Sequence, residues 1–277
     1  MSRAKACRVL LLVLCAMVGG GCGGQYIMSI PDQLARPGGE TTTVVRLQRN
    51  DFFVLAPPLK QAAMLFQIAG GPNRGAYTDN LGYAATTVPV PKEPGQYTMK
   101  VLHLDKVYGD EPAREGRVYV WDPNRPAIAV DMDCLPGMLL GSSKNAARAL
   151  RRLAEGADLL YLTRRSVSHH AKDHETLRRA GYPAGPILAW QRQRWHIVRE
   201  GRFNLPRVVV ESRLVSQLPE LRRMFPKLAT GVCDSALAAR AYAAAGMTVV
   251  MVGGAPADAD TGTRRRSSWA DLADKGP

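Results

Sequence analysis

Apolar and polar positions alternate over short runs between residues 36 and 122. Runs such as TTTVVRLQ, AAMLFQIA and GRVYVW have the two-residue period of a strand that buries one face. Turn-forming Pro, Gly and Asn residues separate these runs, and signals for helices are few. The spacing predicts an antiparallel β-sandwich over residues 36–122.

From residue 126 the pattern changes to apolar strands that alternate with helical segments. The expected strands are AIAV, DLLYL, PILAW, RVVVE, LATGVC and MTVVMVG. Between them, segments such as SSKNAARALRRLAEG begin with Ser, continue with Ala, Leu and Arg, and end with Gly, as helices do. This alternation predicts a Rossmann-like α/β domain with a parallel sheet over residues 126–254. The polar stretch 255–277 is expected to be disordered.

The first 21 residues have the pattern of an export signal. Three basic residues precede the ten-residue apolar run Val9–Val18, which is too short to cross a bilayer as a helix. Three glycines then lead to Cys22, an arrangement that resembles a bacterial lipoprotein signal. The resemblance implies that Cys22 becomes a lipidated first residue, followed by a linker over 22–35. We therefore expect an exported, membrane-anchored lipoprotein that faces the periplasm or the cell exterior.

Charge adds a possible class of partner. The net charge of the 277 residues is +13, and it is +10 without Arg3, Lys5 and Arg8 of the signal. A basic balance of this size favours anionic surfaces such as lipid headgroups, phosphates or nucleic acid. The alternative is a solvated basic surface, because the basic residues are scattered and their densest run is only RRR at 264–266. A nucleic-acid partner is not favoured.

Polar side chains follow several of the expected parallel strands. Asp131 and Asp133 come after the first strand, Thr163 after the second and Asp234 after a later one. In such sheets ligands bind at the carboxyl ends of the strands, so these residues share one edge. A carboxylate pair there can bind Mg²⁺, while one aspartate attacks a phosphoryl group and the other carries the leaving-group proton. The alternative is a pair of polar strand ends.

The order of these segments resembles the haloacid dehalogenase-like (HAD) superfamily. AIAVDMD is similar to its first motif, YLT to its second, and GVCDSALAARAYAAAGM to its fourth. Among the branches, LRRAGYPAGPILAW and LPELRRMFP are most similar to the lipin-type phosphatidate phosphatases. These branches lack a large cap domain, which suits bulky substrates. The resemblance implies a Mg²⁺-dependent phosphatase that acts on phosphatidate-like or other bulky phosphomonoesters.

The resemblance also implies a role for each site residue. Asp131 is the nucleophile that forms an aspartyl-phosphate, and Asp133 is the general acid and base. Thr163 positions the phosphoryl group, and Arg213 is the basic residue nearest to where the family has a lysine. Asp131, Asp133 and Asp234 are the Mg²⁺ ligands.

Several departures from the family pattern favour an alternative function. Cys134 and Cys233 stand where the motifs have glycine, and Ala238 stands where the fourth motif has a second aspartate. There is no lysine between Arg207 and Phe225. The alternative is therefore a catalytically degenerate HAD-like domain that binds or scaffolds. In the family's sheet the two cysteines lie at neighbouring strand ends, where an oxidising compartment allows a disulfide; two unpaired thiols are the other possibility.

Three further segments remain open. His170 and His174 are four residues apart on an expected helix, a spacing that can bind a metal, but no third ligand is apparent and a surface histidine patch is the alternative. WQRQRWHIVREGRF interleaves aromatic and basic residues, as nucleic-acid or lipid-headgroup binders do, and the alternative is a β-hairpin or strand with an exposed basic edge. PGQYTMKVLHLD resembles a strand region of Ig-like modules, which implies an Ig-like sandwich that spaces or binds. No glycine-rich phosphate loop is present, so no residues are assigned to an organic cofactor.

Overall fold

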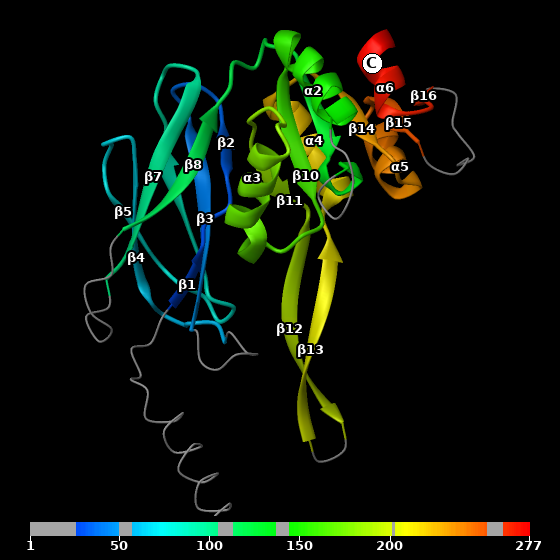
Figure 1. Ribbon diagram of the computed structural model, residues 1–277. Helices are drawn as coiled ribbons and strands as arrows, with labels where there is room; N and C mark the ends of the chain where they lie inside the picture. Colours follow the sequence, from blue (N-terminus) through cyan, green and yellow to red (C-terminus); the bar gives the residue numbers. More distant parts are fainter. Residues whose placement is uncertain (1–25, 50–56, 105–112, 137–143, 201–202, 254–262) are drawn as a thin grey trace, which may run out of the picture.

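The computed structural model has an all-β half and an α/β half (Figure 1). It describes residues 26–49, 57–104, 113–136, 144–200, 203–253 and 263–277, with side chains left out over 192–211. The expected signal and the lipidation site at Cys22 lie outside these ranges. Within them, no helix is both long and apolar enough to cross a membrane.

The all-β half consists of two sheets that enclose one core. The three-stranded sheet has the order β1-β3-β6 and is antiparallel, with bounds Tyr26–Ser29, Glu40–Arg49 and Tyr83–Pro89. The five-stranded sheet has the order β2-β8-β7-β4-β5, with bounds Gln33–Ala35, Arg114–Val120, Gly95–His103, Ala63–Ile68 and Arg74–Tyr77. Apolar side chains from both sheets, such as Leu47, Phe66 and Val118, are fully buried between them. All pairs in this half are antiparallel except that β2 pairs with β8 in parallel.

Residues 26–35, which were expected to form a linker, instead supply one strand to each sheet of the all-β half. The segment is short, and its apolar residues are spaced too irregularly to show an alternating pattern. Its strands are fixed by pairing with β3 and β8 rather than by their own sequence.

The α/β half is built on a six-stranded parallel sheet with the order β11-β10-β9-β14-β15-β16. Its strands are Ile187–Ala189, Asp158–Thr163, Ala127–Asp131, Leu228–Cys233, Thr248–Val252 and Thr263–Arg266. The inner strands are continuous apolar runs because both faces of the sheet are covered. The predicted combination of an all-β region and a parallel sheet with helices is therefore confirmed.

Helices cover both faces of this sheet. Helices α2 (Lys144–Gly156), α3 (His170–Arg179) and α6 (Trp269–Lys275) contribute to the apolar core on one face. Helices α4 (Leu214–Met224) and α5 (Ala236–Ala244) contribute to the core on the other face. The close packing of α5 requires a glycine in β14, because a Cβ at Gly231 would lie 2.4 Å from the ring of Tyr242.

Two parts of the α/β half differ from expectation. The RVVVE run lies in β13 (Phe203–Ser212), which pairs antiparallel with β12 (Gln191–Glu200) in a hairpin outside the sheet. Within the WQRQRWHIVREGRF segment, residues 191–200 are β12 and Phe203 begins β13, and the two paired strands extend away from the sheet in Figure 1. The tail, expected to be disordered over 255–277, contains β16 and α6 instead. α6 packs on α2 through Leu272 and Ala273, which are buried.

The two halves share an apolar junction. Leu34, Tyr119 and Trp121 of the all-β half belong to the same buried cluster as Trp190 and Phe225 of the α/β half. The rings of Trp121 and Phe225 meet edge to face at 5.8 Å. The junction places residues of the first 35 positions next to residues beyond position 160.

Candidate functional site

The predicted site residues gather at the carboxyl edge of the parallel sheet. β9 ends at Asp131 and pairs with β10, so that Leu162 lies opposite Asp131 and Thr163 follows. On its other side β9 pairs with β14, where Val232 lies opposite Val130. In the sheet, β10 and β11 lie in sequence order on one side of β9, and β14, β15 and β16 lie in sequence order on its other side. The strand order therefore reverses between β9 and β14. The edge at β9 and β14 is thus the position where such sheets bind ligands.

Asp131 is a buried carboxylate at this edge, with 5% of its surface exposed. After it the chain forms a single 3₁₀ turn, η2 (Met132–Cys134), and the amide of Asp133 donates to Asp131 Oδ1 at 3.1 Å. Burial raises the pKa of Asp131 to about 6, and the negative charges of Asp133 and Asp234 add to the rise. The hydrogen bond that Asp131 accepts from the Asp133 amide opposes the rise. The site therefore holds an acid whose charged form is poorly compensated.

Asp133 is connected to the second strand. The Thr163 hydroxyl donates to Asp133 Oδ1 at 3.1 Å, and the Arg164 amide and Nε donate to Asp133 Oδ2 at 3.0 and 3.1 Å. Asp133 and Thr163 are thus brought together as the sequence predicted. Arg164 was missed, although it directly follows Thr163. It is the only cation among the described residues that makes an ion pair with either aspartate of the pair.

Asp234 follows β14 and is exposed. Because it directly follows Cys233, the last residue of β14, it lies at the same carboxyl edge as Asp131, and its negative charge helps to raise the pKa of Asp131. The next residue, Ser235, caps α5 by accepting from the Ala238 amide at 3.2 Å. Ala238 is buried, with 3% exposed, and so offers no ligand where the resembled motif has an aspartate.

Two main-chain hydrogen bonds hold Arg213 near the same edge of the sheet. The Trp190 amide donates to the Thr163 carbonyl at 3.0 Å, and the Arg213 amide donates to the Trp190 carbonyl at 2.7 Å. Arg213 therefore lies directly after the last residue of β13 and is the N-cap residue of α4. Its side chain is exposed, and within the described part of the chain its guanidinium forms no hydrogen bond or ion pair with the aspartates.

The two cysteines border the aspartates but remain free thiols, so the disulfide considered above is not formed. The Cys134 thiol donates to the Asp131 carbonyl at 2.8 Å, and Cys233 is fully buried at the end of β14. Burial raises the pKa of both thiols, with further contributions from Asp131 and Asp234, and the pKa of Cys233 reaches about 12. Neither thiol is therefore a nucleophile at neutral pH.

We expect both thiols to resist alkylation in the folded chain. At pH 8 iodoacetamide should modify Cys134 and Cys233 much more slowly than in the urea-unfolded chain, because only a thiolate reacts and burial suppresses it. Peptide mass spectrometry of timed samples measures each site separately. A Cys134 that reacts at the rate of an unfolded thiol would contradict the assigned environment.

A second cluster lies at the junction of the two halves. His170 and His174 lie one turn apart on α3, and their Nε2 atoms are 2.9 and 2.7 Å from Oδ1 and Oδ2 of Asp32. The Ile187 amide, in β11, donates to Asp32 Oδ2 at 2.8 Å. Burial raises the pKa of Asp32, but the bonds from the two histidines outweigh this, so that the pKa is lowered overall.

Sequence reasoning found the spacing of the histidines but not Asp32. Asp32 is separated from His170 by 138 positions and lies between β1 and β2, in the segment expected to be a linker. No local pattern marks it. Among the described residues, this is the one group that brings three possible ligand atoms within 4.8 Å of one another, and the carboxylates at the sheet edge do not form such a group.

Comparisons with known proteins assign no family. No family model matches the chain, and no curated protein matches it. Among solved structures, the chain is similar to the D00-D0 domain of intimin, with 18% identity over 38% of this chain and 52% of that one, at a TM-score of 0.28. It is also similar to a carbohydrate acetylesterase from Xanthomonas citri, with 12% identity over 71% of this chain and 37% of that one, at a TM-score of 0.27.

A polysaccharide deacetylase from Bacillus cereus shows 9% identity over 90% of this chain and 99% of that one, at a TM-score of 0.22. The chain spans about half of the intimin fragment and a smaller share of the esterase. TM-scores this low carry no argument about the chain, so its function must be argued from its own residues.

Proposed function

We propose that the α/β half is a HAD-like domain that hydrolyses phosphomonoesters with Mg²⁺. The observation that carries the proposal is Asp131, a buried carboxylate at the switch point of the sheet whose pKa is raised by burial and by two neighbouring acids. A polar strand end needs no such cluster of charge. Three like charges that meet a single counter-charge, the exposed Arg164, are typical of sites that bind a cation or an anionic substrate through one.

The donor set suits Mg²⁺. Asp131, Asp133 and Asp234 supply carboxylate oxygens, the ligands that this ion prefers, and the charges of Asp133 and Asp234 both act on Asp131. Their oxygens do not all lie within 4.8 Å of one another, so a bound ion would draw them closer together. When bound, Mg²⁺ neutralises the negative charge that the carboxylates and the phosphoryl group bring together. These three residues are the ones that would hold it.

The reaction assigns one step to each aspartate. A carboxylate oxygen of Asp131 attacks phosphorus and forms an aspartyl-phosphate, while the bond from phosphorus to the ester oxygen breaks. The leaving alkoxide takes its proton from Asp133. Water then attacks the aspartyl-phosphate and gives its proton back to Asp133, which releases inorganic phosphate and restores Asp131. Thr163 and Arg164, which now donate to Asp133, orient its carboxyl group between the two steps.

The uncapped site suits a bulky substrate. The part of the α/β half that is described has no cap domain, and only the β12–β13 hairpin leaves the carboxyl edge between β11 and α4. We include in the proposal that Cys22 anchors an exported chain and that the all-β half is an Ig-like spacer. A phosphatidate-like lipid is then a substrate within reach of the site.

A degenerate, non-catalytic HAD-like domain is the second candidate, and specific contacts favour it. Both oxygens of Asp133 are already bonded to Thr163 and Arg164. Arg213 does not reach the aspartates within the described part of the chain, and Ala238 is buried in α5. Such a domain would bind a phosphorylated partner or act as a scaffold without turnover.

The test is hydrolysis of p-nitrophenyl phosphate and of phosphatidate micelles, with and without Mg²⁺. For Asp133→Asn we expect single-turnover alcohol release from phosphatidate to fall by about a hundredfold, because the alkoxide then lacks its proton donor. Release of p-nitrophenolate, a good leaving group, should change far less. Equal losses on both substrates would mean that Asp133 serves as a Mg²⁺ ligand and not as the proton donor. A wild-type chain without Mg²⁺-dependent turnover would favour the degenerate domain.

A further inference from the structure

The junction cluster has the geometry of a metal site. Asp32 comes from the all-β half, whereas His170 and His174 lie on α3 of the α/β half. The rings of the two histidines are nearly perpendicular, with 84° between their planes and 4.7 Å between their centroids. This arrangement lets both Nε2 atoms point at one place without stacking of the rings, and that place is the Asp32 carboxylate.

Two imidazoles and one carboxylate are the donor set that zinc and related divalent transition metals take in proteins. With metal–ligand bonds of about 2.0–2.1 Å, the ligand atoms of a tetrahedral site lie about 3.3 Å apart. The two histidine–carboxylate separations of 2.9 and 2.7 Å therefore need to widen by only about half an ångström. Both imidazoles keep some exposure, 11% and 15%, so that small ring rotations are possible.

The carboxylate is oriented independently of the histidines. The Ile187 amide donates to Asp32 Oδ2, and the carboxylate side chain is fully buried. Such a hydrogen bond from the main chain fixes the direction of a ligand in the way that outer-sphere partners do in metal sites. Asp32 would therefore keep its position when a metal replaces the hydrogen bonds between the two imidazoles and its carboxylate.

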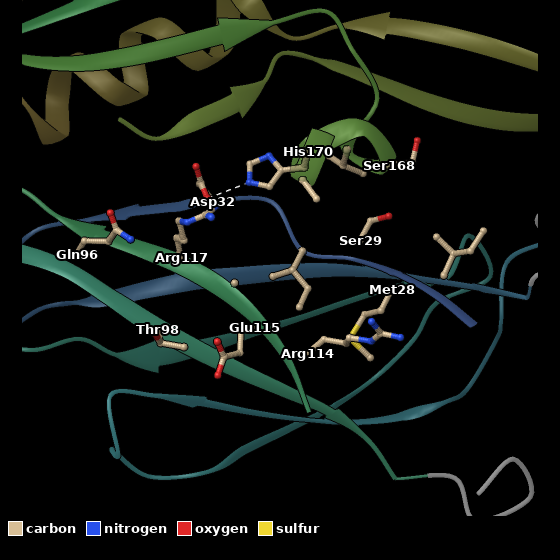
Figure 2. A pocket seen from close by; sticks show the side chains of 15 residues that line it. Met28, Ser29, Asp32, Gln96, Thr98, Arg114, Glu115, Arg117, Ser168 and His170 are labelled. Atoms are coloured by element: carbon tan, nitrogen blue, oxygen red, sulfur yellow. Dashed lines mark hydrogen bonds and ion pairs between the residues drawn. The ribbon is translucent and has the colours of Figure 1, made fainter. Parts of the chain in front are cut away.

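A pocket gives access to the cluster. A cavity of about 480 Å³ lies beside it, lined by Asp32 and His170 together with Ser29, Gln96, Arg117 and Ser168 (Figure 2). In Figure 2, the His170 ring points at Asp32, and both side chains line this cavity. Three protein ligands leave a coordination position open, and here that position can face the cavity. Arg114 and Arg117 line the cavity against the single carboxylate of Glu115, and this basic excess favours an anionic ligand at that position.

We propose that Asp32, His170 and His174 bind a divalent transition metal, with Zn²⁺ as the ion they suit best, and that its open position takes a small anionic ligand from the cavity. The proposal does not depend on the phosphatase proposal, since the two sites share no residue. The metal would also tie the all-β half to α3.

The test is Zn²⁺ binding to the purified, EDTA-treated chain in excess Mg²⁺, which competes with Zn²⁺ for sites made of carboxylates alone. Isothermal titration should give one Zn²⁺ per chain, and Co²⁺ in its place should give visible absorption bands. His170→Gln and His174→Gln should each weaken binding by at least about tenfold. His169→Gln is the matched control, because this neighbouring histidine lies outside the cluster, and it should bind as the wild type does.

Two results would overturn the proposal. One is the absence of stoichiometric Zn²⁺ binding by the folded wild-type chain. The other is binding that survives in both glutamine variants or that His169→Gln weakens equally. If the variants unfold, carbethoxylation of the wild-type histidines decides: Zn²⁺ should protect His170 and His174 but not His169, and equal modification with and without Zn²⁺ would refute the site.

Discussion

Asp131→Asn is expected to abolish Mg²⁺-dependent hydrolysis and at the same time to stabilise the folded chain. The loss of turnover should be at least about a thousandfold, because the amide cannot attack phosphorus. The gain in stability has a separate cause. The pKa of Asp131 rises from 3.8 to about 6 on folding, so the folded state loses stability as the pH rises through this range.

The sign and size follow from proton linkage. The unfolded chain releases the proton near 3.8 and the folded chain only near 6, so the cost of ionising Asp131 is complete above pH 6. A rise of this size corresponds to about 3 kcal/mol. The asparagine oxygen can still accept from the Asp133 amide, and no charge is left to bury. At pH 7.5 we therefore expect the free energy of unfolding to rise by about 1–2 kcal/mol, which raises Tm by about 3–6 °C.

Thermal unfolding at pH 5 and pH 7.5 measures this effect. Asp158→Asn is the matched control, since Asp158 lies in β10 of the same sheet at the opposite end and is paired with Arg125 at 3.2 Å. Burial also raises the pKa of Asp158, but the Arg125 charge opposes the rise and the substitution removes this ion pair, so the control should gain less stability than Asp131→Asn does. Mg²⁺ should raise the Tm of the wild type but not that of Asp131→Asn. An Asp131→Asn chain that is less stable than the wild type would identify Asp131 as a structural strand end.

The residues at the carboxyl edge of the sheet could be predicted from the sequence because short local patterns determine which residues lie there. Buried parallel strands are continuous apolar runs, and the residue after each run must lie at one edge. Asp131, Asp133 and Thr163 could be grouped for this reason, and the structure brings them together. The direction of each side chain has no such signature. The Arg164 side chain turns to Asp133, whereas that of Arg213 does not, and no pattern in the sequence distinguishes the two.

Other features depend on pairing partners far along the chain. The RVVVE run has the composition of a buried parallel strand, yet β13 pairs with β12, because the two strands are close in sequence, with Glu200 opposite Phe203. α6 is a helix of seven residues that owes its order to packing on α2. Asp32 is the extreme case, since it lies in a segment without clear periodicity and its partners follow 138 and 142 positions later.

Asp32→Ala is expected to lower the free energy of unfolding by about 3 kcal/mol. The substitution leaves the Ile187 amide buried without an acceptor and removes the common partner of His170 and His174. It also breaks a polar link between the two halves, whose remaining junction contacts include the apolar cluster around Trp121. The loss should appear in EDTA, because these hydrogen bonds require no metal.

Urea unfolding in EDTA and amide hydrogen exchange measure the two parts of this expectation. The Ile187 amide should exchange faster in Asp32→Ala by more than the global loss of stability explains. Asp122→Ala is the matched control, since Asp122 precedes the α/β half and its exposed carboxylate accepts from the Asn124 amide at 2.9 Å. It should change stability by less than about 1 kcal/mol. Because a buried carboxylate with three donors is worth far more than an exposed cap, equal effects of the two substitutions would mean that Asp32 does not join the halves.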